Sequence, residues 1–245
     1  MAPQLPDFLG LGTQKGGTTT LHWLLTQHQQ VHLPECKEVQ FFTQHHHQGE
    51  GWYRSHFEKA SPLQRCGEIT PFYLFHPEAP GRIQALLPQA KLIVLLRDPV
   101  ERAISHYFHA RKRGFEPLEL EKAFAAEPSR LASGDPFSFQ KHSYLSRSRY
   151  LEQLDRYEAL FPRHQLLILR SEDLFQHVEQ IWPRLLEFLD LEPSVVPARL
   201  PQANAGQSEA RSIDPALRDR LREQLSGTVA GVWSRYGIAW GWGLD

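Results

Sequence analysis

Lysine, glycine and threonine gather near the start of the chain in a pattern that can bind an anion. Residues 13–20 read Thr-Gln-Lys-Gly-Gly-Thr-Thr-Thr, with Lys15 directly before two glycines. Glycines let a backbone approach a ligand closely, and the lysine adds a compact positive charge. Thr18 is a good N-cap residue, and the apolar residues after it have helical spacing, so a helix is expected to direct its first N–H groups at an anion. The alternative is an ordinary turn with a surface lysine.

The position of the lysine distinguishes this Lys15 loop (residues 12–17) from the phosphate loop of proteins that bind nucleoside triphosphates. In that loop the lysine follows the second glycine of Gly-x-x-x-x-Gly-Lys-Ser/Thr. Here Lys15 precedes Gly16 and Gly17. The order favours a different anion, although a kinase or nucleotidase that uses Mg-ATP stays open as an alternative.

A second set of candidate residues follows the most apolar segment of the chain. Residues 91–96, Lys-Leu-Ile-Val-Leu-Leu, predict a buried strand of a parallel sheet. Arg97 comes directly after it, and Ser105 lies about two turns along a predicted helix. Ligands of open α/β sheets bind at the carboxyl ends of strands, and a guanidinium suits a phosphate. A salt bridge from Arg97 to Asp98 or Glu101 at the start of the helix is the alternative.

The third candidate is a carboxylate in residues 37–42, Lys-Glu-Val-Gln-Phe-Phe. We call these residues the base segment, because a glutamate can remove the proton of an alcohol while a new bond forms to its oxygen. Glu38 would then be a general base. The alternative for Glu38 is a solvated charge on a loop.

The order of the predicted elements indicates an α/β protein. Apolar runs predict strands at residues 8–11, 66–70, 91–96 and 165–169. Helical spacing predicts helices that begin near residue 18 and cover 78–87, 100–113, 118–133, 149–160, 178–189 and 214–225. Residues 43–65 and 134–148 are predicted to be irregular. Because strands alternate with helices, we expect a P-loop-type three-layer fold, a central parallel sheet flanked by helices, in one domain over residues 1–245.

Composition narrows the class of protein. A chain of 245 residues with 41% hydrophobic and 22% charged residues can bury one sizeable core. Its net charge of −1 gives no basic field, so nucleic acid is not an expected partner. Cys36 and Cys66 are too few for a disulfide framework and are predicted to be free thiols. With no signal peptide or long apolar run in the sequence, we expect a cytoplasmic protein without a membrane anchor.

These residues together resemble the sulfotransferases that use 3′-phosphoadenosine 5′-phosphosulfate (PAPS), above all the heparan sulfate sulfotransferases and their bacterial relatives. The Lys15 loop resembles their 5′-phosphosulfate loop, and the order of Arg97 and Ser105 resembles their 3′-phosphate-binding element. The resemblance implies that Glu38 is the general base and that Lys15 stabilises the leaving group. It also implies that the 5′-phosphosulfate is held by Lys15, Gly16, Gly17, Thr18, Thr19 and Thr20.

Weaker matches extend along the chain. Residues 148–150 resemble a segment near the cofactor, which makes Tyr150 a candidate contact, and Arg211 lies where relatives close a loop over the cofactor. Three positions depart from the family pattern: Gln40 replaces a histidine of the heparan enzymes, Ile69 replaces their lysine near the acceptor, and Ser148 replaces the usual glycine of the segment near the cofactor. The acceptor therefore stays open.

The implied reaction moves a sulfuryl group from PAPS to a hydroxyl, or an amine, of a carbohydrate or small-molecule acceptor by in-line displacement. It releases 3′,5′-ADP and requires no metal. The histidines at 45–47 lack the spacing of a zinc site and are expected in a polar loop near the acceptor. The motifs weakly suggest a bacterial source, and no feature indicates an oligomeric state. A non-catalytic PAPS-binding protein remains a further alternative.

Overall fold

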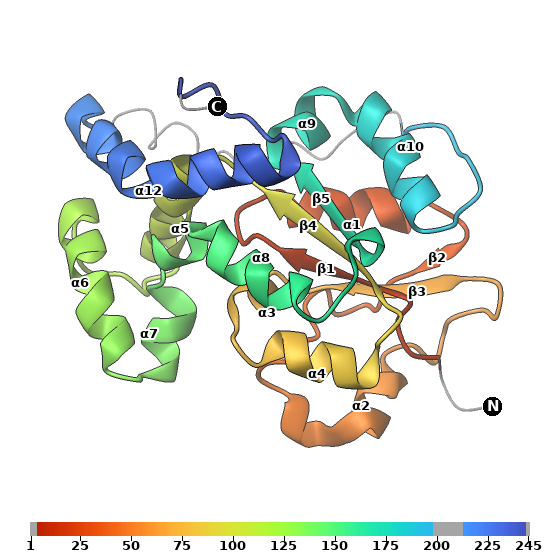
Figure 1. Cartoon of the computed structure of the whole chain (residues 1–245). Coiled ribbons are helices and arrows are strands. Elements are labelled where there is room, and N and C mark those ends of the chain that lie inside the picture. The colour runs from red at the N-terminus through yellow and green to blue at the C-terminus, as the bar shows by residue number, and fades with distance from the viewer. Residues whose placement is uncertain (1–3, 198–212, 244–245) are drawn as a thin grey trace. The chain divides into compact units, whose positions relative to one another are not determined.

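A parallel sheet organises the fold, with strands that come from between residues 8 and 170 (Figure 1). The computed structural model describes residues 4–197 and 213–243. Within them the strands are β1 (Phe8–Gly12), β2 (Val31–His32), β3 (Arg65–Ile69), β4 (Lys91–Leu96) and β5 (Leu166–Arg170). Their order across the sheet is β2-β3-β1-β4-β5, and every neighbouring pair is parallel. The predicted α/β fold with a central parallel sheet is confirmed.

The chain forms two structural units. One comprises Met1–Leu96 and Gln153–Ala203 and holds the whole sheet, and the other comprises Arg97–Glu152 and Asn204–Asp245. The single domain over residues 1–245 stays a prediction.

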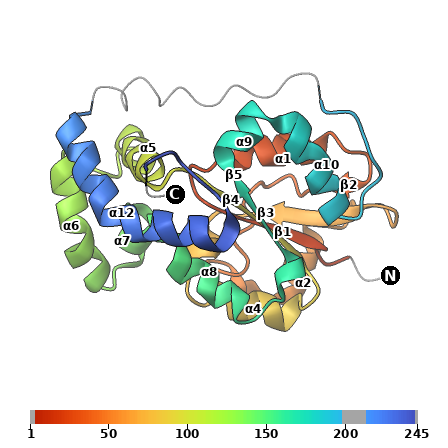
Figure 2. The same cartoon turned by 45° about the horizontal axis from the view of Figure 1, so that its top comes forward.

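Helices cover both faces of the sheet (Figures 1 and 2). One face carries α1 (Thr18–Thr26), α9 (Ser171–Gln176) and α10 (Val178–Phe188). The opposite face carries α3 (Phe72–Phe75) and α4 (Ala79–Leu86), both labelled in Figure 1. Leu21, Ile93 and Trp182 belong to the buried apolar cluster between the first set of helices and the strands. Because both faces are covered, residues 92–96 of β4 are all fully buried, which explains their continuous apolar run.

The second unit is helical. Its elements are α5 (Pro99–Lys112), α6 (Leu120–Ala132), α7 (Pro136–Lys141), a 3-10 turn at Ser146–Ser148, the start of α8 (Tyr150–Glu158), and α12 (Pro215–Tyr236). Its core joins α5, α6 and α12 through residues such as Ile104, Phe124 and Leu221. Asp98 starts α5, because its Oδ1 accepts hydrogen bonds from the N–H groups of Val100 at 2.9 Å and Glu101 at 3.0 Å.

Several sequence predictions about local structure were wrong. Residues 43–65 contain a 3-10 turn at His46–Gln48 and α2 (Gly49–Ser55), and residues 134–148 contain α7. The Asp135 side chain caps α7 by accepting from the Ser138 N–H at 2.9 Å. Helices of two turns or fewer show too little apolar periodicity to be recognised, and α9 was missed for the same reason. The helix predicted over 214–225 continues to Tyr236, because its apolar face continues past residue 225 with two buried valines.

Two further findings concern the cysteines and the search for a membrane-spanning helix. Cys36 is exposed and Cys66 is buried, and both are free, which confirms the prediction. Among residues 4–197 and 213–243, no helix combines the length and the apolar character that crossing a bilayer demands.

Candidate functional site

The Lys15 loop turns the chain from β1 into α1. Gly17 has a φ of 90°, a left-handed conformation that suits glycine, and it is the N-cap of α1. Thr18 is therefore the first helical residue, so its prediction as the N-cap was wrong by one position. Lys15 also adopts a left-handed backbone with a φ of 69°. A non-glycine residue keeps such a conformation only where its surroundings hold it, which is common at functional sites.

Hydrogen bonds within the first unit hold this loop. The Thr13 N–H donates to the Leu95 carbonyl at 2.6 Å, and the Gly16 N–H donates to the Thr13 carbonyl at 2.9 Å. The Ser171 hydroxyl donates to the Gly16 carbonyl. Leu95 lies near the end of β4 and Ser171 follows β5, so the loop is fixed at the carboxyl edge of the sheet, where ligands of such sheets bind.

The base segment lies against the start of α1. Lys37 Nζ lies 3.0 Å from the hydroxyl of Thr19 and 3.7 Å from Oε1 of Glu38. Glu38 is 42% exposed, so its carboxylate is open to an incoming molecule. The structure thus brings Glu38 and the helix that follows the Lys15 loop together through Lys37, a residue to which the sequence assigned no role. The signals in the sequence were its position beside Glu38 and its place in the motif of residues 37–42.

The side chain of Gln40 orients the carboxylate of Glu38. Gln40 Nε2 donates to Glu38 Oε2 at 3.2 Å, and the Thr43 hydroxyl donates to Gln40 Oε1 at 2.7 Å. Gln40 itself has a left-handed φ of 60°. Gln40, one of the positions at which this sequence departs from the heparan enzymes, therefore contacts the candidate base.

The three threonines of the predicted loop differ in exposure. Thr18 and Thr20 are buried, whereas Thr19 is exposed and contacts Lys37. The roles of all three toward a phosphosulfate stay predictions.

The predicted 3′-phosphate residues belong to the second unit. Arg97 is the residue after β4, and its carbonyl accepts a hydrogen bond from the hydroxyl of the fully buried Tyr150 at 2.7 Å. Ser105 is half-buried on α5. Asp98 caps α5 and also accepts from Trp242 Nε1 at 2.9 Å, and Glu101 pairs with Arg218.

Tyr150 sits beside a buried connection that supports the turn after Arg97. The Ser148 hydroxyl donates to the Pro99 carbonyl at 2.6 Å, and Arg102 donates to Ser148 Oγ at 2.7 Å and to the Tyr144 carbonyl. The Tyr150 contact with Arg97 gives it a supporting role for Arg97, and its contact with a cofactor stays a prediction. Arg211 lies outside the described residues.

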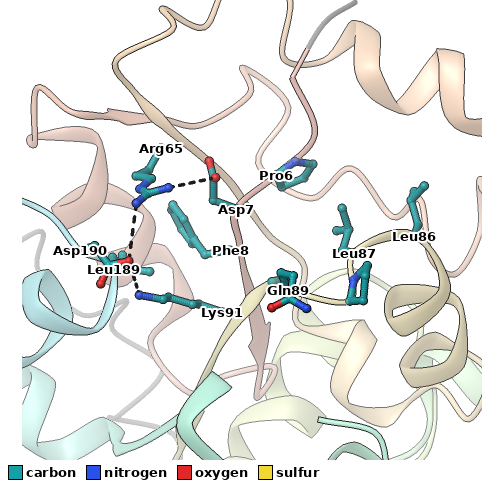
Figure 3. A pocket seen from close by; sticks show the side chains of 12 residues that line it. Pro6, Asp7, Phe8, Arg65, Leu86, Leu87, Gln89, Lys91, Leu189 and Asp190 are labelled. Atoms are coloured by element: carbon teal, nitrogen blue, oxygen red, sulfur yellow. Dashed lines mark hydrogen bonds and ion pairs between the residues drawn. The ribbon is translucent and has the colours of Figure 1, made fainter. Parts of the chain in front are cut away.

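A cavity of about 370 Å³ lies at the amino ends of the strands, opposite to the end at which the Lys15 loop lies (Figure 3). Its lining includes Asp7 and Lys91, at the amino ends of β1 and β4. The charged groups pair with one another: Arg65 lies 3.4 Å from Asp7 and 3.5 Å from Asp190, and Lys91 lies 2.6 Å from Asp190. The Lys15 loop follows the carboxyl end of β1, whereas this cavity lies at the amino ends of the strands. The cavity is therefore separate from the loop and is not the candidate site.

Comparison with known proteins agrees with this geometry. The sequence model of the sulfotransferase domain matches residues 5–210. The chain is 33% identical over 202 residues to the human bifunctional heparan sulfate N-deacetylase/N-sulfotransferase 3, covering 78% of this chain and 23% of that protein. It is also 33% identical over 190 residues to the mouse heparan sulfate glucosamine 3-O-sulfotransferase 3B1, covering 77% of this chain and 47% of that protein. The chain spans about half or less of the length of the curated relatives it matches.

A solved structure agrees over almost the whole chain. The crystal structure of a sulfotransferase from Alicyclobacillus acidocaldarius superposes with a TM-score of 0.81 at 25% identity, covering 97% of this chain and 98% of that one. The P-loop-type three-layer fold and the family resemblance drawn from the motifs are both confirmed. This chain belongs to the sulfotransferase family.

Proposed function

We propose that the chain transfers a sulfuryl group from PAPS to a hydroxyl, or an amine, of an acceptor and releases 3′,5′-ADP. The contact of Lys37 with both Thr19 and Glu38 carries this proposal, because it places an exposed carboxylate beside the helix that follows the anion-binding loop. A base next to an anion site suits a reaction in which the acceptor loses its proton while a charged group is transferred to it.

The candidate site residues of the first unit carry out the chemical step. The acceptor oxygen forms a bond to sulfur as the bond from sulfur to the 5′-phosphate oxygen breaks, and Glu38 accepts the acceptor's proton. Lys15 stabilises the negative charge that develops on the leaving oxygen, and the first N–H groups of α1 hold the phosphosulfate. Gln40 keeps the Glu38 carboxylate oriented.

The second unit is proposed to select the nucleotide. Arg97 and Ser105 bind the 3′-phosphate that distinguishes PAPS from ATP, Tyr150 supports Arg97 through its carbonyl, and Arg211 adds a contact to a phosphate. A guanidinium in a bidentate pair suits a phosphate well. The reaction as proposed needs no metal.

The proposed acceptor is a carbohydrate or a small-molecule alcohol. Two curated relatives are named for the sulfation of heparan sulfate, one at nitrogen and one at oxygen. In this chain Ile69 replaces the lysine of the heparan enzymes, and its fully buried side chain packs in the sheet core, so position 69 offers no charge to an acceptor. A cytoplasmic location stays a prediction from the sequence, with which the two free thiols are consistent.

Calorimetric titration with 3′,5′-ADP, 5′-ADP and Mg-ATP tests the proposal, with the first two titrations run in EDTA. We expect micromolar binding of 3′,5′-ADP and no comparable binding of 5′-ADP or Mg-ATP. Labelled PAPS is then supplied with a glucosamine oligosaccharide, its N-acetylated form and a simple long-chain alcohol, which separates amine from hydroxyl acceptors. Absence of 3′,5′-ADP binding, or a preference for Mg-ATP, would overturn the proposal in favour of a kinase. If 3′,5′-ADP binds but no acceptor is sulfated and PAPS itself is not broken down, the chain is a non-catalytic PAPS-binding protein.

Replacing Arg97 by alanine should weaken 3′,5′-ADP binding by roughly 10- to 100-fold, the worth of hydrogen bonds to a charged group. Titration measures the change, and 5′-ADP should bind equally poorly to both proteins. Arg113→Ala is the matched control, since Arg113 is an exposed arginine at the end of α5 in the same unit. Equal losses in both variants would show a general charge effect and contradict a specific 3′-phosphate contact.

Replacing Gly16 by alanine should lower both thermal stability and 3′,5′-ADP affinity. A Cβ at this position would lie 2.9 Å from the Thr13 carbonyl oxygen and 3.0 Å from the Leu95 carbonyl oxygen, so the loop must shift. We expect a loss of affinity of about tenfold or more, as for the loss of one or two hydrogen bonds. Gly51→Ala is the control, because a Cβ on that helical glycine meets nothing within 4 Å. Unchanged affinity in the Gly16 variant would show that the loop does not bind the cofactor.

A further inference from the structure

We propose that the buried carboxylate of Glu68 is the positioning group that holds the base segment, and with it Glu38, in place for sulfuryl transfer. The inference rests on the proposed function, because it assigns a new residue to that reaction. It gives the β3 strand a part in the chemistry that the motif comparison did not assign.

Glu68 accepts hydrogen bonds from three hydroxyl groups. It lies on β3 with 1% of its surface exposed. Tyr53 and Tyr73 donate to its Oε1 at 2.6 and 2.8 Å, and Thr70 donates to its Oε2 at 3.0 Å. The backbone of Val39 also helps to hold the pKa of this carboxyl down, against the effect of burial. A buried charge with this many donors is satisfied, which is the condition for keeping a carboxylate in a protein interior.

Two of these hydroxyls link the Glu68 carboxylate to the base segment, because each also accepts a hydrogen bond from that segment. Thr70 Oγ1 accepts from the Gln40 N–H at 3.5 Å, and the Tyr73 hydroxyl accepts from the Phe42 N–H at 3.3 Å. Two of the four backbone amides after Glu38 therefore reach Glu68 through one hydroxyl. Buried backbone N–H groups need acceptors, so Glu68 fixes the path of the chain on which Glu38 stands.

The direction of these hydrogen bonds requires an acceptor at position 68. Each relay hydroxyl receives a hydrogen from the base segment and passes its own hydrogen to Glu68. An ionised carboxylate is acceptor-only and fits all of these donors, whereas a glutamine brings two hydrogens of its own. A glutamine at 68 would therefore meet a donor with a donor and release part of the base segment.

The charge of Glu68 changes near neutral pH. Burial raises the pKa of Glu68 to about 7, although its hydroxyl and backbone donors oppose this shift. The titratable groups that face it are Tyr53 of α2 and Tyr73 of α3, and burial raises both their pKa values, so they stay protonated. Above pH 7 the ionised carboxylate holds the segment. As the pH falls through 7, the added proton meets neighbours that already donate, and the segment loosens.

The first test measures turnover in Glu68→Gln, Glu38→Gln and the double variant, with the best acceptor of the panel above. We expect Glu68→Gln to lower kcat ~10- to 100-fold, as for a displaced catalytic group, with the affinity for 3′,5′-ADP unchanged. In the Glu38→Gln background the same change should have no further effect beyond about twofold. In the wild type we expect kcat to fall as the pH decreases through 7, and in Glu68→Gln this dependence of kcat on pH should be weaker. An equal loss in both backgrounds, or a wild-type rate in Glu68→Gln, would overturn the inference.

The second test measures amide exchange of residues 38–42, which does not depend on an acceptor. Tyr73→Phe removes a relay, whereas Tyr53→Phe removes an equally buried hydroxyl that contacts Glu68 alone. Exchange, corrected for the intrinsic pH effect, should quicken ~5- to 10-fold in Tyr73→Phe and in Glu68→Gln, and hardly change in Tyr53→Phe. Equal exchange in all variants would refute the anchor. If wild type binds no 3′,5′-ADP, the proposed function fails, and this test still decides the anchor.

Discussion

Glutamine in place of Glu38 is expected to lower kcat by roughly 10²- to 10⁴-fold, the range that a positioned general base contributes. The substitution keeps the size of the side chain and removes its ability to take a proton. The amide oxygen keeps one of the two donors, Lys37 or Gln40, and water reaches the other because position 38 is exposed, so the local structure should survive. The affinity for 3′,5′-ADP should be unchanged, because the Lys15 loop is held by β4 and α9 and not by Glu38. Turnover at saturating PAPS and a titration with 3′,5′-ADP measure the two quantities.

The control for this prediction lies three residues earlier. Glu35 is 84% exposed and pairs with Lys59 at 2.5 Å, so Glu35→Gln removes the same charge from a solvated site. It should leave kcat within about twofold, because exposed ion pairs contribute little. If both variants lose activity equally, the effect is one of charge on the segment. If neither does, another group accepts the proton and the assignment of Glu38 is wrong.

The elements that carry the motifs could be predicted from the sequence because their signals are local. The β1–loop–α1 unit appears as an apolar run, two glycines and a helical pattern within 19 residues, from Phe8 to Thr26. The run from Lys91 to Leu96 is apolar because both faces of the sheet are covered, and Pro99 marks the helix that follows. Such signals need no knowledge of distant residues.

The contacts that build the site could not be predicted, because they join residues far apart in the chain. Lys37 meets Thr19 across 18 positions, and Ser171 meets Gly16 across 155. No local pattern at Lys37 or Ser171 indicates these partners. The same reason explains Glu68, which the sequence places in a strand beside a proline and which only the fold surrounds with Tyr53, Tyr73 and the base segment.

The base segment and the Lys15 loop are fixed by different parts of the first unit. The loop depends on the ends of β4 and β5, whereas the base segment depends on Glu68 of β3 and on the hydroxyls around it. Binding of the sulfuryl donor and removal of the acceptor proton are therefore separable. Changes at Gly16 should act on affinity, and changes at Glu68 should act on kcat.

Methionine in place of Lys15 is expected to lower kcat by roughly 10²- to 10³-fold, as the loss of one group that stabilises a developing oxyanion does. Lys15 stands in the left-handed conformation between Thr13 and Gly16, which are hydrogen-bonded to each other, so the loop fixes the backbone from which its side chain starts. Methionine keeps most of the length and the apolar part of lysine and removes the charge. Lys37 cannot replace that charge, because its ammonium group is engaged by Thr19 and Glu38.

The kinetic pattern tells a role in the transition state from simple binding. If Lys15 acts on the leaving oxygen, kcat falls at saturating PAPS and KM changes little, whereas loss of an ordinary contact raises KM and spares kcat. Lys91→Met is the control, since Lys91 begins β4 at the opposite edge of the same sheet and pairs with Asp190. It should retain wild-type kcat after correction for any loss of folded protein. A Lys15 variant that changed KM alone would show that the loop binds PAPS and that the leaving group departs without help from this lysine.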